Sequence, residues 1–304
     1  MKSKIETQKT TTSIPIEYHA DDFGMFQTQS RRILECYENG TLNGVSVMPN
    51  SSALAECMKL LQPVKQDVSV TIHLNIIEGR SLTAAEEVPL LTYETGVFRV
   101  SFGSLLLHSY LPGRKAYREQ LKKELRAQIH AVRAYLTEDL SVRLDGHAHY
   151  HMLPVVFDAL MDVIREDNLD VSYIRIPREY PSLYLRHLRE IQDFSAINLV
   201  KVLILNLLSL RNRRKYAQVL DTMEQRLFLG VFLSGRMYRE NVEPVIPEAI
   251  ALAQRQGKGI EILAHPGGVY EKADIDQLTN QEDIEFLTSE FRRKEKTMFE
   301  PMLQ

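Results

Sequence analysis

Cysteine and tryptophan are scarce in this 304-residue chain, which has two cysteines, Cys36 and Cys57, and no tryptophan. Both cysteines lie inside helix-like patterns, where small buried side chains are the simplest interpretation. Two such residues provide neither a disulfide framework nor a thiolate zinc site. We therefore expect the protein to belong to a reducing compartment.

A large net charge and a long apolar run are also missing. The 37 basic and 40 acidic residues give a formal net charge of -3, which provides no electrostatic case for nucleic acid. The most apolar segment, 196–210, is interrupted by Lys201 and is shorter than the ~20 residues that cross a bilayer, so no membrane partner is expected. Residues 1–13 lack the apolar core of a signal peptide. We expect them to form a disordered lead-in and the protein to be cytoplasmic.

Short β-like runs alternate with helical patterns along the rest of the chain. No internal repeat or convincing linker is found, so the sequence predicts a single domain over residues 14–304. Seven candidate strands, most with a helix behind them, predict an α/β fold with parallel strands, and that number favours a distorted, TIM-like (β/α) barrel. The candidate strands are IPIEYHA, GVSVMPN, DVSVTIHLN, VRLDGHAH, DVSYIRIP, RLFLGVFLS and GIEILAHPGG.

Two insertions interrupt the alternation, near residues 76–114 and 178–225. Each follows the C-terminal end of a predicted strand, which is the side where parallel α/β barrels place their active sites. They are candidates for substrate-binding walls or for the contacts of a homodimer. Ordinary surface elaboration is the alternative interpretation.

The segment DGHAHYH, residues 145–151, places three of the nine histidines at alternate positions directly after an aspartate. On a strand, His147, His149 and His151 would all project from the face that carries Asp145. Converging imidazoles supply the neutral nitrogen donors that a divalent metal ion binds. A single histidine in a strand is more often a core or surface residue, but three in register beside a carboxylate favour a metal or catalytic site. The remaining ligands are then expected elsewhere in the chain.

Carboxylates and histidines also gather where other predicted strands end. Asp21 and Asp22 are adjacent, so they diverge on a strand and suit different tasks, one as a metal ligand and the other as a proton acceptor. A helix cap or turn would explain one of them but not both. His73 closes the strand TIHLN, where core packing is the default interpretation. His265 lies in AHPGG, which cannot continue as a regular strand and suits a general acid at the barrel mouth.

Two arginines flank a proline in RIPRE. Arg175 or Arg178 can pair with one of the two aspartates and hold it ionised, or orient it. For Arg178, a surface salt bridge with Glu179 is an equally good interpretation.

These segments, taken in order and spacing, resemble the YdjC-like carbohydrate deacetylases, the group that contains the chitooligosaccharide deacetylases and the hopanoid-biosynthesis deacetylases. The resemblance covers about residues 14–270, and its specific part is ADDFG combined with D-x-H-x-H-x-H. It implies a distorted (β/α) barrel and metal-dependent hydrolysis of an acetamide on an N-acetylated sugar or short oligosaccharide, with release of acetate. The segments that carry the resemblance are HADDFG, GTLNGVSVMPN, HLN, DGHAHYH, RIPRE and AHPGG.

The resemblance also implies a role for each matching residue. Asp21 would be the general base that activates the attacking water, Arg175 would orient that base, and His265 would protonate the leaving amine or stabilise the oxyanion. One divalent metal ion is implied; zinc is preferred for two imidazoles and a carboxylate, but magnesium, nickel, cobalt or manganese fits the same donors. The implied metal ligands are Asp22, His73 and His147.

The sequence departs from the family pattern beside the first motif. His19 replaces the asparagine that usually precedes ADDFG, and Met25-Phe26 replaces the common Leu-Ser, which puts the pocket floor and the substrate in question rather than the reaction. One of the two remaining triplet histidines is expected to line the sugar site and the other to support the metal ligands. The predicted substrate-binding residues are His149, His151 and Arg178.

Two alternative functions remain. One is another metal-dependent barrel hydrolase, such as an amidohydrolase or phosphoesterase, although amidohydrolases usually carry H-x-H on their first strand and here the histidine cluster lies on the fourth. The other is a catalytically inactive carbohydrate-binding relative. The retained Asp21, Asp22, His73 and His147 argue against it, because losing a ligand is the simplest route to inactivity.

Overall fold

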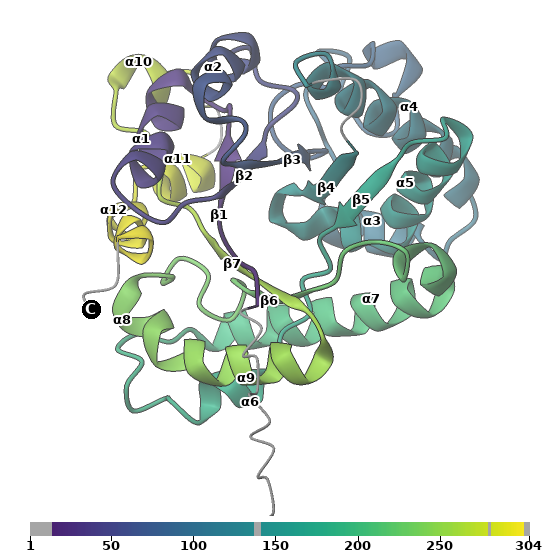
Figure 1. Ribbon diagram of the computed structural model, residues 1–304. Helices are drawn as coiled ribbons and strands as arrows, with labels where there is room; N and C mark the ends of the chain where they lie inside the picture. The colour runs from purple at the N-terminus through teal and green to yellow at the C-terminus, as the bar shows by residue number, and fades with distance from the viewer. Residues whose placement is uncertain (1–13, 137–140, 279–280, 301–304) are drawn as a thin grey trace, which may run out of the picture.

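The computed structural model describes residues 14–136, 141–278 and 281–300, so the predicted lead-in at 1–13 lies outside the described residues. Within them, seven parallel strands form one sheet in the spatial order β5-β4-β3-β2-β1-β7-β6 (Figure 1). All seven predicted strands are present. They are β1 (Ile16–Phe23), β2 (Gly44–Val47), β3 (Ser69–Leu74), β4 (Val142–Gly146), β5 (Val171–Ile174), β6 (Arg226–Leu229) and β7 (Gly259–Ala264).

Helices surround the curled sheet (Figure 1). In α4 the apolar residues at three- and four-residue steps, from Leu121 to Val132, are buried as the sequence pattern predicts. None of the helices in the described part of the chain combines the length and apolarity needed to span a bilayer. The helices are α1 (Gln27–Glu38), α2 (Leu54–Leu61), α3 (Phe102–His108), α4 (Arg114–Arg133), α5 (Pro154–Glu166), α6 (Pro181–Leu185), α7 (Ala196–Leu220), α8 (Arg239–Val242), α9 (Ile246–Gln256), α10 (Lys272–Ile275), α11 (Gln281–Leu287) and α12 (Glu290–Glu295).

The predicted parallel α/β barrel-like fold is confirmed, but the barrel is not closed. The two edge strands, β5 and β6, do not pair with each other in the described residues, so the sheet is a curled half-barrel. Between them in the chain lies the insertion predicted at 178–225, which contains α6 and α7. Side chains of both edge strands, including Tyr173 and Arg226, line a cavity between the strands. This cavity lies where a closed seven-stranded barrel would have its seventh strand pairing.

The end of β1 has an irregularity that separates its two aspartates. Ala20 pairs with Val45 and Phe23 with Val47, so three steps along β1 match two along β2. Asp22 supplies the extra residue and has a φ of 66°, in the left-handed region that few non-glycine residues adopt. The bulge turns the neighbouring carboxylates toward different partners, as the adjacency of Asp21 and Asp22 predicts.

A buried carboxylate ties the two edges of the half-barrel together. Glu179, after β5, accepts hydrogen bonds from the backbone N–H groups of Gly230, Val231 (2.9 Å) and Phe232 (2.7 Å), after β6. No ion pair joins Arg178 to Glu179 among the described residues, so the surface salt bridge considered for that pair is wrong. The Glu179 carboxylate instead links the segments after the two edge strands by hydrogen bonds.

We expect Glu179→Gln to lower the free energy of unfolding by about 1–3 kcal/mol, because an amide nitrogen cannot accept the hydrogen bonds of backbone donors. Urea unfolding measures the change, with the exposed Glu86→Gln as the matched control. An unfolding midpoint for Glu179→Gln equal to that of the control would show that these hydrogen bonds do not stabilise the fold.

Candidate active site

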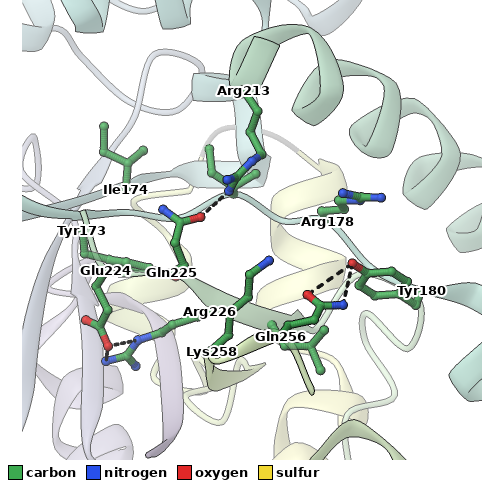
Figure 2. A pocket seen from close by; sticks show the side chains of 12 residues that line it. Tyr173, Ile174, Arg178, Tyr180, Arg213, Glu224, Gln225, Arg226, Gln256 and Lys258 are labelled. Atoms are coloured by element: carbon green, nitrogen blue, oxygen red, sulfur yellow. Dashed lines mark hydrogen bonds and ion pairs between the residues drawn. The ribbon is translucent and has the colours of Figure 1, made fainter. Parts of the chain in front are cut away.

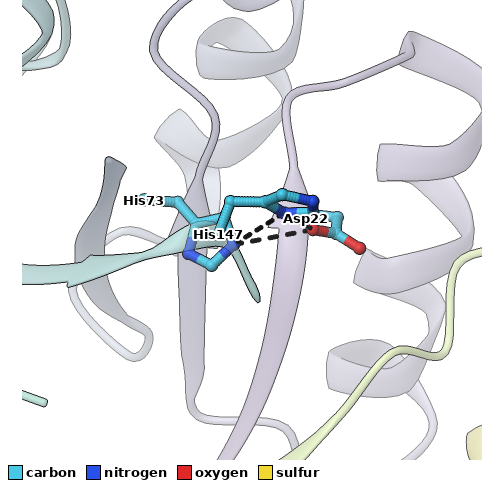
Figure 3. Close-up of side chains that lie close together, drawn as sticks. All are labelled: Asp22, His73 and His147. Carbon is cyan, nitrogen blue, oxygen red and sulfur yellow. Dashed lines mark hydrogen bonds and ion pairs between the residues drawn. The ribbon is translucent and has the colours of Figure 1, made fainter. Parts of the chain in front are cut away.

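The three residues implied as metal ligands meet at the C-terminal ends of the strands. Asp22 lies at the end of β1, His73 on β3, and His147 directly after β4 (Figure 3). His147 Nδ1 lies 3.1 Å from Asp22 Oδ1 and 3.3 Å from His73 Nε2. His73 Nε2 lies 3.6 Å from Asp22 Oδ1. One donor atom from each residue therefore faces a common point.

This spacing fits a divalent metal ion. Two ligand atoms that are each ~2.1 Å from a tetrahedral zinc lie about 3.4 Å from one another, and the three observed separations run from 3.1 to 3.6 Å. The two imidazole nitrogens also face each other directly, and one metal ion satisfies both lone pairs. Two imidazoles and one carboxylate leave a coordination position open, as catalytic zinc sites do.

Neighbouring charges shift the pKa values of Asp22 and His73. Burial alone would raise the pKa of Asp22, but the Arg292 guanidinium and hydrogen bonds from His147 and His73 hold it well below its usual value. Burial would lower the pKa of His73, but the Asp145 and Asp21 carboxylates raise it to about 9. We therefore expect metal binding near neutral pH to displace protons from the imidazoles.

Both histidines are oriented by a carboxylate on the far side of the ring. His73 Nδ1 donates to Asp145 Oδ1 at 2.7 Å, and His147 Nε2 donates to Glu78 Oε1 at 2.9 Å. Such pairs fix the tautomer and direction of a ligating imidazole. Strand alternation places Asp145 near the site from sequence alone, whereas Glu78 lies in the 76–114 insertion, where no motif marks it.

The predicted pair of base and orienting arginine is also assembled. Arg175 Nη1 donates to Asp21 Oδ1 and Oδ2 at 3.0 and 2.9 Å. Asp21 Oδ2 lies 3.9 Å from His73 Nε2, so this carboxylate adjoins the metal-ligand group without sharing its tightest contacts. Arg175 is completely buried and also pairs with Asp145 and Glu261, each at 2.6 Å.

The expectation that three histidines project from one strand face is wrong. β4 ends at Gly146, and residues His147–Met152 form a 3-10 helix in which Ala148 and His149 have positive φ. The period-two alternation holds only while the chain stays extended. Only His147 turns toward Asp22 and His73.

The other two triplet histidines lie inside the half-barrel. His149 packs edge-on against Phe228 of β6, with ring centroids 5.6 Å apart, and His151 Nε2 donates to the Arg175 carbonyl at 2.8 Å. Burial lowers the pKa of His151 to about 4, so its ring is neutral at pH 7. His151 supports the backbone of Arg175, and the substrate-binding roles of His149 and His151 stay predictions.

Arg178 lies apart from the metal-ligand group. It lines the cavity between β5 and β6 together with Arg213 and Lys258 (Figure 2). No contact in the described part of the chain joins it to Asp21, so its substrate-binding role also stays a prediction.

His265 lies beside the C-terminal helix α12. Its backbone N–H donates to Glu295 Oε2 at 2.6 Å, and its side chain keeps 16% of its surface exposed. From the same helix, Arg292 Nη2 donates to Asp22 Oδ2 at 2.7 Å. Neither Arg292 nor Glu295 belongs to a motif that the sequence alone singles out.

Comparisons with known proteins agree with the resemblance. The chain is 27% identical over 161 residues to a carbohydrate deacetylase of Thermoanaerobacter pseudethanolicus; the match covers 53% of this chain and spans only 61% of that relative's length. It is 25% identical over 261 residues to a chitooligosaccharide deacetylase of Yersinia enterocolitica, covering 83% of this chain and 96% of the relative.

A solved structure from Enterococcus faecalis V583, described as a candidate cellobiose-phosphate cleavage protein, has the same fold. It superposes with a TM-score of 0.60 at 15% identity, covering 95% of this chain and 97% of that one. The sequence model of the YdjC-like protein family matches residues 16–296, a range that includes every strand and all of α12. The predicted resemblance is confirmed, and the chain belongs to the YdjC-like family.

Proposed function

We propose that this protein is a metal-dependent carbohydrate deacetylase that hydrolyses the acetamide of an N-acetylated sugar or short, chitooligosaccharide-like oligosaccharide. The observation that carries the proposal is the convergence of Asp22, His73 and His147 beside the Arg175–Asp21 pair. The names of the two deacetylase relatives support the substrate class. The products would be the free amine and acetate.

Each of these residues would have a separate role in amide hydrolysis. Asp22, His73 and His147 would hold one divalent metal ion, preferably zinc, which when bound supplies a Lewis acid for the acetamide carbonyl and lowers the pKa of water. Asp21 accepts the proton of the attacking water, and Arg175 holds that carboxylate in place. His265 donates a proton to the departing amine nitrogen, which leaves poorly as an anion.

We expect the chelated protein to release no acetate from N,N'-diacetylchitobiose and longer chitooligosaccharides, and zinc or cobalt to restore release. Asp21→Asn should lower kcat by about 10²–10⁴-fold, the usual contribution of a general base. The exposed Asp170→Asn is the matched control. No acetate from a broad panel of N-acetylated glycans would contradict the proposal, and metal-dependent phosphate release from simple phosphoesters would favour a phosphoesterase instead.

Asp145→Asn should weaken zinc binding by about 10–100-fold, because the carboxylate that orients a ligating histidine contributes that much to metal affinity. Titration of the chelated protein with zinc against a competing chelator measures the dissociation constant. Near-ultraviolet circular dichroism of the variant is the control for correct folding. An unchanged dissociation constant would mean that His73 does not depend on Asp145.

We also propose a homodimer that forms through the outer face of α7. The apolar residues on this face recur at three- and four-residue steps, so they form a stripe that would pair with its own copy around a two-fold axis. In an antiparallel arrangement the stripes of the two copies would lie against each other. The exposed apolar side chains are Ile197, Val200, Leu203, Ile204, Leu207 and Leu210.

Leu207→Glu should convert this dimer to a monomer, because it places a charge in the middle of the stripe, where Leu207 is 69% exposed. Light scattering coupled to size-exclusion chromatography gives the mass of each variant. Leu82→Glu, at an exposed leucine outside α7, should leave the mass unchanged. A monomeric wild-type protein at micromolar concentration would contradict the proposed interface.

A further inference from the structure

Helix α12 presents two buried charges of opposite sign to the proposed site. Arg292 and Glu295 are each 1% exposed, and their spacing places them on one face of the helix. Burying a charge is costly unless it is paired and hydrogen-bonded. Each of these side chains has one partner in the proposed site, Asp22 for Arg292 and His265 for Glu295.

Arg292 joins the end of β1 to the loop after β7. Its Nη2 donates to Asp22 Oδ2 at 2.7 Å, and its Nη1 donates to the Gly267 carbonyl at 3.0 Å. The other oxygen of Asp22, Oδ1, faces His147. The guanidinium therefore occupies one oxygen of the carboxylate and leaves the second one directed at the metal-ligand group.

Glu295 holds His265 and the loop after β6. Its Oε2 accepts the His265 backbone N–H at 2.6 Å, and its Oε1 accepts the Met237 backbone N–H at 3.0 Å. The same Oε2 lies 3.5 Å from His265 Nδ1, which has no hydrogen-bond partner of its own in the described residues. The ring also packs edge-on against Phe286. With Nδ1 turned to a buried carboxylate, Nε2 is the ring nitrogen directed away from α12.

We propose that Arg292 and Glu295 are positioning residues of the proposed site, Arg292 for the metal ligand Asp22 and Glu295 for the imidazole of His265. The Glu295 part rests on the proposed deacetylase function. As the C–N bond breaks, His265 Nε2–H transfers its proton to the amine nitrogen, and the neutral imidazole keeps its Nδ1–H toward Glu295, which stays a carboxylate. Solvent then reprotonates His265 and takes up the proton that Asp21 accepted from water.

The Glu295 part is tested by comparing two leaving groups. Glu295→Gln should lower kcat on an N-acetylated chitooligosaccharide by about 10–100-fold with little change in KM, the usual cost of losing an orienting partner. Hydrolysis of 4-nitrophenyl acetate should be nearly unaffected, since 4-nitrophenolate leaves without a proton. Glu290→Gln, at an exposed position of the same helix, is the control.

A double-mutant cycle separates positioning from folding. In a His265→Ala background, Glu295→Gln should cost no further activity, because the residue that it positions is already gone. Equal losses on both substrates, or a full additional loss in the His265→Ala background, would overturn the Glu295 assignment. Unchanged acetamide hydrolysis in Glu295→Gln would overturn it as well.

The Arg292 part is tested on metal binding and needs no deacetylase activity. Arg292→Met should raise the zinc dissociation constant by about 10–100-fold and change the visible spectrum of the cobalt-substituted protein, and Arg292→Lys should recover part of the loss. Arg293→Met, at an exposed neighbouring position, is the control. A wild-type dissociation constant and cobalt spectrum in Arg292→Met would overturn the assignment, even if the wild-type protein hydrolyses no acetamide.

Discussion

The buried guanidinium of Arg175 is the interaction on which the geometry of the site depends. It binds Asp21 of β1 and Glu261 of the neighbouring β7, together with Asp145 of β4, which is separated from β1 by two strands. Burial would lower the pKa of Arg175, but these carboxylates hold it well above its usual value. Removing one partner from such a buried group leaves an uncompensated charge, which typically costs about 3–5 kcal/mol. The position of the proposed base and that of the carboxylate behind His73 are therefore set by one cation.

The bulge at the end of β1 separates this buried network from the metal-ligand group. Asp21 faces inward to Arg175, whereas Asp22, in its left-handed conformation, faces His147 and Arg292. In the proposed mechanism, Asp21 accepts a proton and Asp22 binds a cation. Two adjacent aspartates in a regular strand would also point apart, but the strand alone would not bring the second one to a buried arginine of α12.

The residues predictable from sequence are those whose positions follow from the parallel strands. Because such strands end at one edge, residues at the ends of β1, β3 and β4 were expected to meet, and Asp22, His73 and His147 do. His149 and His151 depart from the expectation because β4 ends at Gly146, and local alternation carries no information beyond that point. Arg292 and Glu295 lie in a charged terminal segment that has the composition of a solvated surface helix, and their partners at Asp22 and His265 are remote in sequence.

The proposed function requires that Asp22, His73 and His147 bind one divalent metal ion. Zinc K-edge X-ray absorption on the stoichiometrically loaded protein, together with its metal content, tests this most directly. We expect one zinc per chain with two imidazole nitrogens and carboxylate oxygen in its coordination shell, and loss of that zinc in a variant carrying both His73→Ala and His147→Ala. Retention of stoichiometric zinc with an unchanged spectrum in that variant would contradict it.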